Sequence, residues 1–151
     1  MKATKASIDA FLSSKKLAVA GVSRDPKKFG HQVFKQLVEK GFEVYPINPG
    51  TDSIDGTPCF RSVSSLPLSV HSIVILTPKK QTRDVVAEAI TKGIDSIWIQ
   101  QMCDTPEAIE LTRQHPVNLI TKECILMHTD PVTGIHKFHR NIKRFFGLYP
   151  K

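Results

Sequence analysis

The chain has 151 residues, 40% of them hydrophobic, which fits one globular domain over residues 1–151 with no apolar stretch long enough to span a membrane. No apolar signal core stands at the N-terminus, and Cys59, Cys103 and Cys124 form no Cys-x-x-Cys pair, so we expect a cytoplasmic protein without a metal site or a redox dithiol. The net charge of +7 favours an anionic partner, which can be nucleic acid, a membrane surface or a phosphorylated small molecule.

The apolar periodicity predicts an alternation of helices and strands. It begins with an amphipathic helix over residues 4–14, which places Ile8, Phe11 and Leu12 on one side. Strands are then expected at 17–20, 42–47, 70–76, 94–99 and 117–120, and helices at 31–40, 80–92 and 105–115. This alternation specifies an α/β fold, a Rossmann-like doubly wound sheet of about five parallel strands with flanking helices and a core over residues 8–127.

Glycine, proline and threonine mark the helix ends. Gly41 and Gly93 stand where left-handed helix ends are expected, and Thr105 precedes Pro106 as an N-cap precedes the first helical residue. Residues 50–68 are rich in Asp, Ser, Gly and Pro, so we expect them to be irregular, with a short strand or turn around residues 58–60.

The turn after the first strand has the composition of a phosphate-binding loop. Gly21 lets the backbone approach a ligand, Ser23 offers a hydroxyl, and Arg24, Lys27 and Lys28 can neutralise phosphate. The following helix would direct its free N–H groups to the same place. Neither Gly-x-Gly-x-x-Gly nor Gly-Lys-Ser/Thr is present, so the usual dinucleotide and triphosphate motifs are absent and a plain strand-to-helix turn is the alternative.

The second strand ends in Asn48 and Pro49, where sites for NAD usually have a carboxylate that binds the adenosine ribose. A ribose that carries a phosphate would repel a carboxylate, so the sequence favours a ribose-phosphorylated nucleotide, either coenzyme A or NADP. Ligands of such sheets bind beyond the carboxyl ends of the strands. The residues expected on this rim are those of 21–28 together with Asn48, Thr77, Gln100 and Cys124. His31, near the start of the first crossover helix, can face the ligand, although a solvated or capping role is favoured.

A basic amphipathic helix is expected in the tail, over residues 134–148. Its apolar residues recur at helical spacing with four cations between them: Ile135, Phe138, Ile142, Phe145 and Phe146, and Lys137, Arg140, Lys143 and Arg144. Such a helix can lie on nucleic acid or a membrane, but we favour packing of its aromatic stripe on the same domain or on a second subunit. His136 and His139 are too few for a metal site.

In this order and spacing, several short motifs resemble one known family. They are Val-Ala-Gly-Val-Ser at 19–23, Gly30, Tyr-Pro-Ile-Asn-Pro at 45–49, Gly56 with Ser-Leu-Pro at 65–67, Thr-Pro at 77–78, Trp-Ile-Gln at 98–100, and Cys124. Over residues 8–127 the chain resembles the small, single-domain CoA-binding proteins related to the nucleotide-binding domain of the succinyl-CoA synthetase alpha subunit. The family often has glycine where this chain has Gln101 and Met102.

The resemblance implies a bound coenzyme A whose phosphorylated nucleotide lies over the first turn. The implied contacts are Gly21, Val22, Ser23, Arg24, Lys27 and Lys28 for the nucleotide, Asn48 and Pro49 beside the adenosine, and Thr77, Pro78 and Gln100 along the path of the pantetheine arm. Cys124 would stand near this rim and could form a mixed disulfide with the thiol of coenzyme A, although a buried structural cysteine is favoured.

The sequence contains no evident catalytic site. The large synthetase keeps its phosphorylated histidine in a second domain, which this length does not supply, and no nucleophile with an adjacent base or credible carboxylate pair is evident. We therefore expect a binding, carrier or regulatory protein for coenzyme A or an acyl-CoA, with a possible homo-oligomer formed through the tail helix. The alternatives are a small NADP-dependent reductase, with Arg24, Lys27 and Lys28 on the 2′-phosphate, and a module that binds nucleic acid or protein through the tail.

Overall fold

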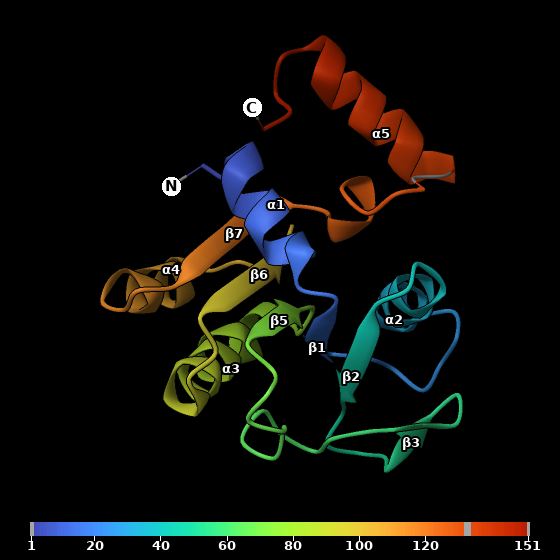
Figure 1. Cartoon of the computed structure of the whole chain (residues 1–151), viewed down its shortest axis with the longest axis vertical. Coiled ribbons are helices and arrows are strands. Elements are labelled where there is room, and N and C mark those ends of the chain that lie inside the picture. The colour runs from blue at the N-terminus through green and yellow to red at the C-terminus, as the bar shows by residue number, and fades with distance from the viewer. Residues whose placement is uncertain (1, 132–133, 151) are drawn as a thin grey trace.

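The computed structural model, which describes residues 2–131 and 134–150, is built around a sheet of five parallel strands (Figure 1). Across the sheet the strands are β2 (Glu43–Ile47), β1 (Lys16–Ala20), β5 (Ser72–Ile75), β6 (Ser96–Gln100) and β7 (Asn118–Glu123). The Rossmann-like fold expected from the sequence is therefore confirmed. No helix within the described residues is both long enough and apolar enough to cross a membrane.

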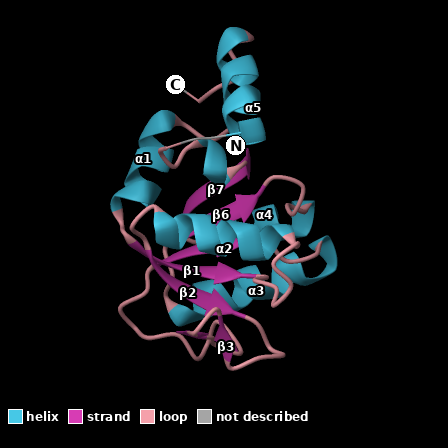
Figure 2. Ribbon diagram, turned by 90° about the vertical axis from the view of Figure 1, so that its right-hand side faces the viewer, coloured by secondary structure: helices cyan, strands magenta, loops and turns pink. Residues whose placement is uncertain are grey.

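Helices cover both faces of the sheet, which is why its central strands are apolar on both sides. Helices α1 (Lys5–Ser13) and α2 (Phe29–Glu39) and the short helix η1 (Ile125–Met127) pack on the face that carries Val19, Val74 and Trp98. Helices α3 (Lys79–Lys92) and α4 (Pro106–Arg113) pack on the other face, against Ala20, Ile75 and Ile99. Figure 2 shows α2 in front of the sheet and α3 behind it.

The expected capping residues are confirmed, although α2 starts at Phe29 rather than at residue 31 and α4 ends at Arg113 rather than at residue 115. Gly41 and Gly93 have φ angles of 88° and 87°, in the left-handed region that glycine adopts without strain. The hydroxyl of Thr105 accepts a hydrogen bond from the backbone N–H of Ala108 at 3.2 Å, and Pro106 is the first residue of α4. These local signals mark the C-terminal ends of α2 and α3 and the start of α4 from the sequence alone.

The connection from β2 to β5 contains a small hairpin, where the sequence analysis expected irregular chain with a short strand or turn around residues 58–60. Strands β3 (Ser53–Ile54) and β4 (Thr57–Pro58) are antiparallel and are joined by Asp55 and Gly56, both with positive φ. The chain then returns to the sheet, where the N–H of Asn48 donates to the carbonyl of Phe60 at 2.8 Å. From here it crosses β1 to reach β5, so the strand order reverses between β1 and β5.

Helix α5 (Gly134–Phe145) stands at one end of the molecule, where it contacts η1 (Figure 1). A buried polar cluster holds it there. The carboxylate of Glu123 lies 3.0 Å from Nε2 of His128 and 3.1 Å from Nζ of Lys143, and the hydroxyl of Tyr149 lies 2.9 Å from Nδ1 of His128. Burial raises the pKa of the Glu123 carboxyl, but hydrogen bonds from His128 and Lys143 outweigh it and hold that pKa below its ordinary value.

Candidate functional site

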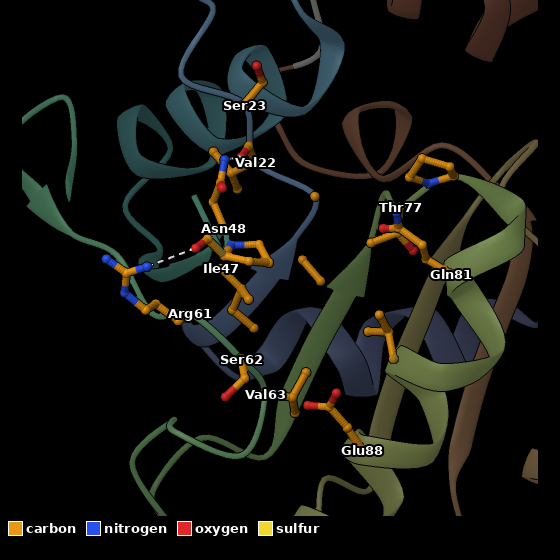
Figure 3. Close-up of a pocket in the computed structure, with 15 residues that line it drawn as sticks. Val22, Ser23, Ile47, Asn48, Arg61, Ser62, Val63, Thr77, Gln81 and Glu88 are labelled. Atoms are coloured by element: carbon orange, nitrogen blue, oxygen red, sulfur yellow. Dashed lines mark hydrogen bonds between the residues drawn. The ribbon is translucent and has the colours of Figure 1, made fainter. Parts of the chain in front are cut away.

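A cavity of about 340 Å³ opens at the carboxyl ends of β1, β2 and β5, where the strand order reverses (Figure 3). Open α/β sheets bind ligands at such a reversal, because the loops after the two central strands leave in opposite directions there. The fifteen residues that line the cavity are Ala20, Gly21, Val22, Ser23, Ile47, Asn48, Pro49, Arg61, Ser62, Val63, Thr77, Pro78, Gln81, Val85 and Glu88.

Two glycines let the turn after β1 lie close to its neighbours. Gly21 has a φ of 93°, and a Cβ there would stand 2.8 Å from the backbone carbon of Leu76. A Cβ on Gly30, in the first turn of α2, would stand 2.2 Å from the carbonyl oxygen of Gly21. Because such contacts are far inside van der Waals range, only glycine allows the start of α2 to approach this turn. The spacing differs from the usual dinucleotide motif, but the close approach of helix to turn is of the same kind.

Asn48 ties the end of β2 to the turn after β1. Its Nδ2 donates to the carbonyl of Val22 at 2.8 Å, and its Oδ1 accepts from the N–H of Gly50 at 2.7 Å. A carboxylate could accept from Gly50 but has no proton to donate to Val22. The absence of an acid at this position thus has a structural reason beside the ribose phosphate that the sequence analysis considered.

The loop that follows Ser23 is ordered by its own side chains and by His31. The Ser23 hydroxyl accepts from the N–H of Asp25 at 3.0 Å. His31 is only 3% exposed, and its ring nitrogens lie 2.7 Å from the carbonyl oxygen of Ser23 and 2.8 Å from the carboxylate of Asp55. The favoured solvated or capping role for this histidine is therefore wrong: it is buried and joins the loop to the β3–β4 hairpin.

Residues 15–130 match the family described as the CoA binding domain. The chain belongs to this family. Among curated relatives, the alpha subunit of ADP-forming acetate–CoA ligase II from Pyrococcus furiosus is 29% identical over 150 residues, which cover 92% of this chain and 31% of the subunit. The chain thus spans about a third of that subunit. The uncharacterized protein YneT of Bacillus subtilis is 27% identical over 123 residues, covering 81% of this chain and 91% of YneT.

Solved structures have the same fold as this CoA-binding domain. A conserved hypothetical protein from Pyrococcus furiosus superposes with a TM-score of 0.73 at 37% identity, covering 76% of this chain and 98% of that chain. A hypothetical protein from Pyrococcus horikoshii gives a TM-score of 0.78 at 28% identity, covering 87% and 94% of the two chains. At these identities the similarity extends beyond the arrangement of strands to the sequence itself.

In the CoA-binding domain, the structure brings together many of the residues that the sequence analysis singled out. Those that line the cavity are Gly21, Val22, Ser23, Asn48, Pro49, Thr77 and Pro78. The three cations of the loop, Arg24, Lys27 and Lys28, are exposed and lie outside the lining. Their side chains are therefore available to a ligand that extends out of the cavity, but do not form its wall.

Gln100 and Cys124 are buried away from the cavity. Each is 1% exposed, and Oε1 of Gln100 accepts from the N–H of Ile125 at 3.1 Å. The sulfur of Cys124 lies 3.7 Å from Nδ1 of His136 on α5. Both side chains thus lie beneath η1 and α5, and Cys124 has the surroundings of the buried structural cysteine that the sequence analysis favoured. No group of three or more potential metal ligands occurs among residues 2–131 and 134–150.

Sequence reasoning missed two segments of the cavity wall. Arg61, Ser62 and Val63 come from the irregular chain after β4, where nothing in the pattern marked them. Nη1 of Arg61 donates to the carbonyl of Pro49 at 3.0 Å, which fixes the guanidinium at the rim (Figure 3). The other segment is the face of α3 that carries Gln81, Val85 and Glu88, whose spacing of four and three residues could have identified it.

Proposed function

We propose that this CoA-binding domain binds coenzyme A or an acyl-CoA at the cavity, as a binding, carrier or regulatory protein. One observation carries the proposal: the cavity lies at the reversal of strand order, in a chain whose residues 15–130 match the CoA binding domain family. A relative with 29% identity is named as a subunit of a CoA ligase, which supports the same ligand class.

The cavity would hold the adenosine end of the ligand. Its volume of about 340 Å³ is at the lower end for ligand sites, so it suits a nucleoside rather than the whole of coenzyme A. Ile47, Val63 and Val85 offer apolar walls for the adenine ring. The carboxylate of Glu88, which Figure 3 shows beside Val63, would accept a hydrogen bond from the amino group of adenine.

The phosphates would lie toward the turn after β1 and the rim. Ser23 and the backbone N–H groups at the start of α2 are suited to a pyrophosphate. These N–H groups are free to bind it, because the side chain of the N-cap residue, Lys28, makes no capping hydrogen bond to them. Arg61 stands at the rim, and the exposed Arg24 and Lys27 would reach the ribose 3′-phosphate outside the cavity.

Binding without a reaction is the role that the lining favours. Among the residues that line the cavity in the described chain, the charged side chains are Arg61 and Glu88, and neither cysteine nor histidine is present. The lining hydroxyls of Ser23, Ser62 and Thr77 bond to backbone or to other hydroxyls. None of these hydroxyls has the adjacent base that activates a nucleophile. We assign to this chain no part of the ligase reaction, because it spans about a third of the ligase subunit.

Melting temperatures in the presence of four nucleotides test the identity of the ligand. A ligand at one hundred times its Kd stabilises the folded chain by about 2.7 kcal/mol, which raises Tm by roughly 5–10 °C at this length. Coenzyme A should give the largest rise, dephospho-coenzyme A a smaller one, and NAD and NADP little. A larger rise in Tm with NADP than with coenzyme A would instead support the small NADP-dependent reductase considered from the sequence. Release of free thiol from acetyl-CoA during incubation with the protein would show that a reaction occurs.

A further inference from the structure

Helix α5 contacts the rest of the chain through its basic side chains. Nη1 of Arg140 lies 3.0 Å from the carboxylate of Asp130, and Nζ of Lys143 lies 3.1 Å from that of Glu123. The guanidinium of Arg144 lies 4.8 Å from the centre of the Tyr149 ring. The polar side of this amphipathic helix is thus directed toward the molecule rather than toward solvent.

The apolar side of α5 is left exposed. Phe138, Ile142, Phe145 and Phe146 are 59%, 39%, 85% and 67% exposed, and Leu148 just beyond the helix is 57% exposed. Packing on the same domain, one of the two arrangements favoured from the sequence, is therefore wrong for these residues, and packing on a second subunit stays a prediction. The side chain of Ile135 lies outside the described part of the chain. We call the five exposed side chains the α5 apolar face. In both views α5 projects from one end of the molecule (Figures 1 and 2).

The size of the α5 apolar face approaches that of half an interface. A fully covered phenylalanine buries about 150–250 Å², so the exposed parts of the five side chains amount to on the order of 500 Å² per copy. Two copies would bury about 1,000 Å², which is where specific protein–protein interfaces begin. An exposed apolar patch of this size is at the upper end for a monomer and is often functional.

The charges around the face favour a second copy of this chain over an acidic partner or an anionic membrane. Those partners would be attracted by free cations, as in basic amphipathic helices that bind membranes. In the described structure Arg140 and Lys143 already have carboxylate partners within the chain. Lys137 and Arg144 are the exposed cations of the described helix, and the guanidinium of Arg144 lies over the Tyr149 ring, so what α5 offers outward is mainly apolar.

We propose that the α5 apolar face is the interface of a homodimer, in which α5 of one copy packs against α5 of the other. Phe138, Ile142 and Phe145 are spaced by four and three residues, the spacing at which two helices pack side by side. An antiparallel pair related by a two-fold axis would bring Phe138 of each copy near Phe145 of the other and oppose the two helix dipoles. No residue of α5 whose side chain the structure describes lines the cavity, so pairing through this face leaves the cavity open.

Sedimentation velocity from 1 to 100 μM tests this pairing. The wild-type chain of 16.9 kDa should double in mass as concentration rises, and 1 M NaCl should not weaken the association. The double variant Phe138→Ser/Phe145→Ser should dimerise at least 100-fold more weakly. The matched control Leu68→Ser/Met102→Ser removes two apolar side chains that are 80% and 78% exposed elsewhere, and should dimerise like wild type.

Three results would overturn the homodimer: a wild-type chain that stays monomeric throughout, a dimer that the α5 variant leaves intact, or equal weakening by the control. If the chain is monomeric and co-floats with vesicles that contain anionic lipid, and high salt abolishes this binding, the α5 apolar face binds a membrane instead. The rise in Tm with coenzyme A should be the same in both double variants. This keeps failure of the dimer separate from failure of CoA binding.

Discussion

Replacing Gly30 by alanine tests whether the first turn of α2 lies against the turn after β1. The new Cβ would stand 2.2 Å from the carbonyl oxygen of Gly21, so one of the two segments must move by roughly 1 Å. Overpacking of this kind costs about 1–3 kcal/mol, whereas the better helix propensity of alanine returns at most about 1 kcal/mol. The steric cost exceeds the gain in helix propensity, because the Cβ is fixed rigidly to one backbone segment and the carbonyl oxygen belongs to the other, so neither can rotate away.

We expect Gly30→Ala to lower the free energy of unfolding by about 2 kcal/mol and Tm by roughly 4–8 °C, measured by urea and thermal denaturation. Gly50→Ala is the matched control, because its Cβ would meet only the Oδ1 atom of the Asn48 side chain, at 3.2 Å. The control should change stability by less than about 1 kcal/mol. A Gly30→Ala variant as stable as wild type, or more stable, would refute the close approach of α2 to Gly21.

Three further predictions concern single side chains. Asn48→Asp should lower the free energy of unfolding by about 1–3 kcal/mol, because a carboxylate cannot donate to the carbonyl of Val22. An unchanged free energy of unfolding in urea denaturation would contradict the role of this hydrogen bond. Glu123→Gln should destabilise the chain by about 1–3 kcal/mol at pH 7. Since the folded pKa of Glu123 is depressed, the stability that wild type gains over Glu123→Gln should be lost as pH falls below about 4. A difference in free energy of unfolding that stays constant from pH 7 to pH 3 would contradict this role of the Glu123 carboxylate. Cys124 should react with an aromatic disulfide reagent only after unfolding, whereas the other two thiols, whose pKa burial raises, react slowly in the native state and faster at higher pH.

The sheet and its helices could be predicted because their signals are local. Short apolar runs such as residues 70–76 contain strands whose side chains are buried beneath helices on both faces of the sheet. The last strand was predicted to end at Ile120, but β7 continues to Glu123. The extension is polar in sequence and is stabilised by distant groups, including the indole N–H of Trp98, which donates to the carbonyl of Glu123 at 3.1 Å. A local pattern carries no information about such partners.

The tail shows the same division between local and tertiary information. Helical spacing predicted α5, but the direction of its apolar side depends on where Asp130 and Glu123 lie. In the structure Arg140 and Lys143 meet these carboxylates while the phenylalanines face outward. The carboxylates lie outside the helix, so no periodicity in the tail could reveal which side is exposed.

The candidate site was predictable where strands end and not elsewhere. Gly21, Asn48 and Thr77 follow parallel strands, so their convergence at one edge follows from the fold. Arg61 enters the wall through an irregular connection of the kind that has no periodic signal. Gln100 also ends a strand, yet it faces the same side as Trp98, beneath η1, and so lies away from the cavity.

Titration calorimetry with coenzyme A, on wild type and on two tryptophan variants of α3, tests most directly whether the cavity is the binding site. Val85→Trp would fill the space between α3 and Val63, whereas Asp84→Trp places the same side chain at an exposed position outside the lining. We predict one coenzyme A per chain for wild type and Asp84→Trp, and at least tenfold weaker binding for Val85→Trp with unchanged melting of the free protein. Equal affinity in all three proteins, or no binding by wild type, would contradict a CoA site at the reversal between β1 and β5.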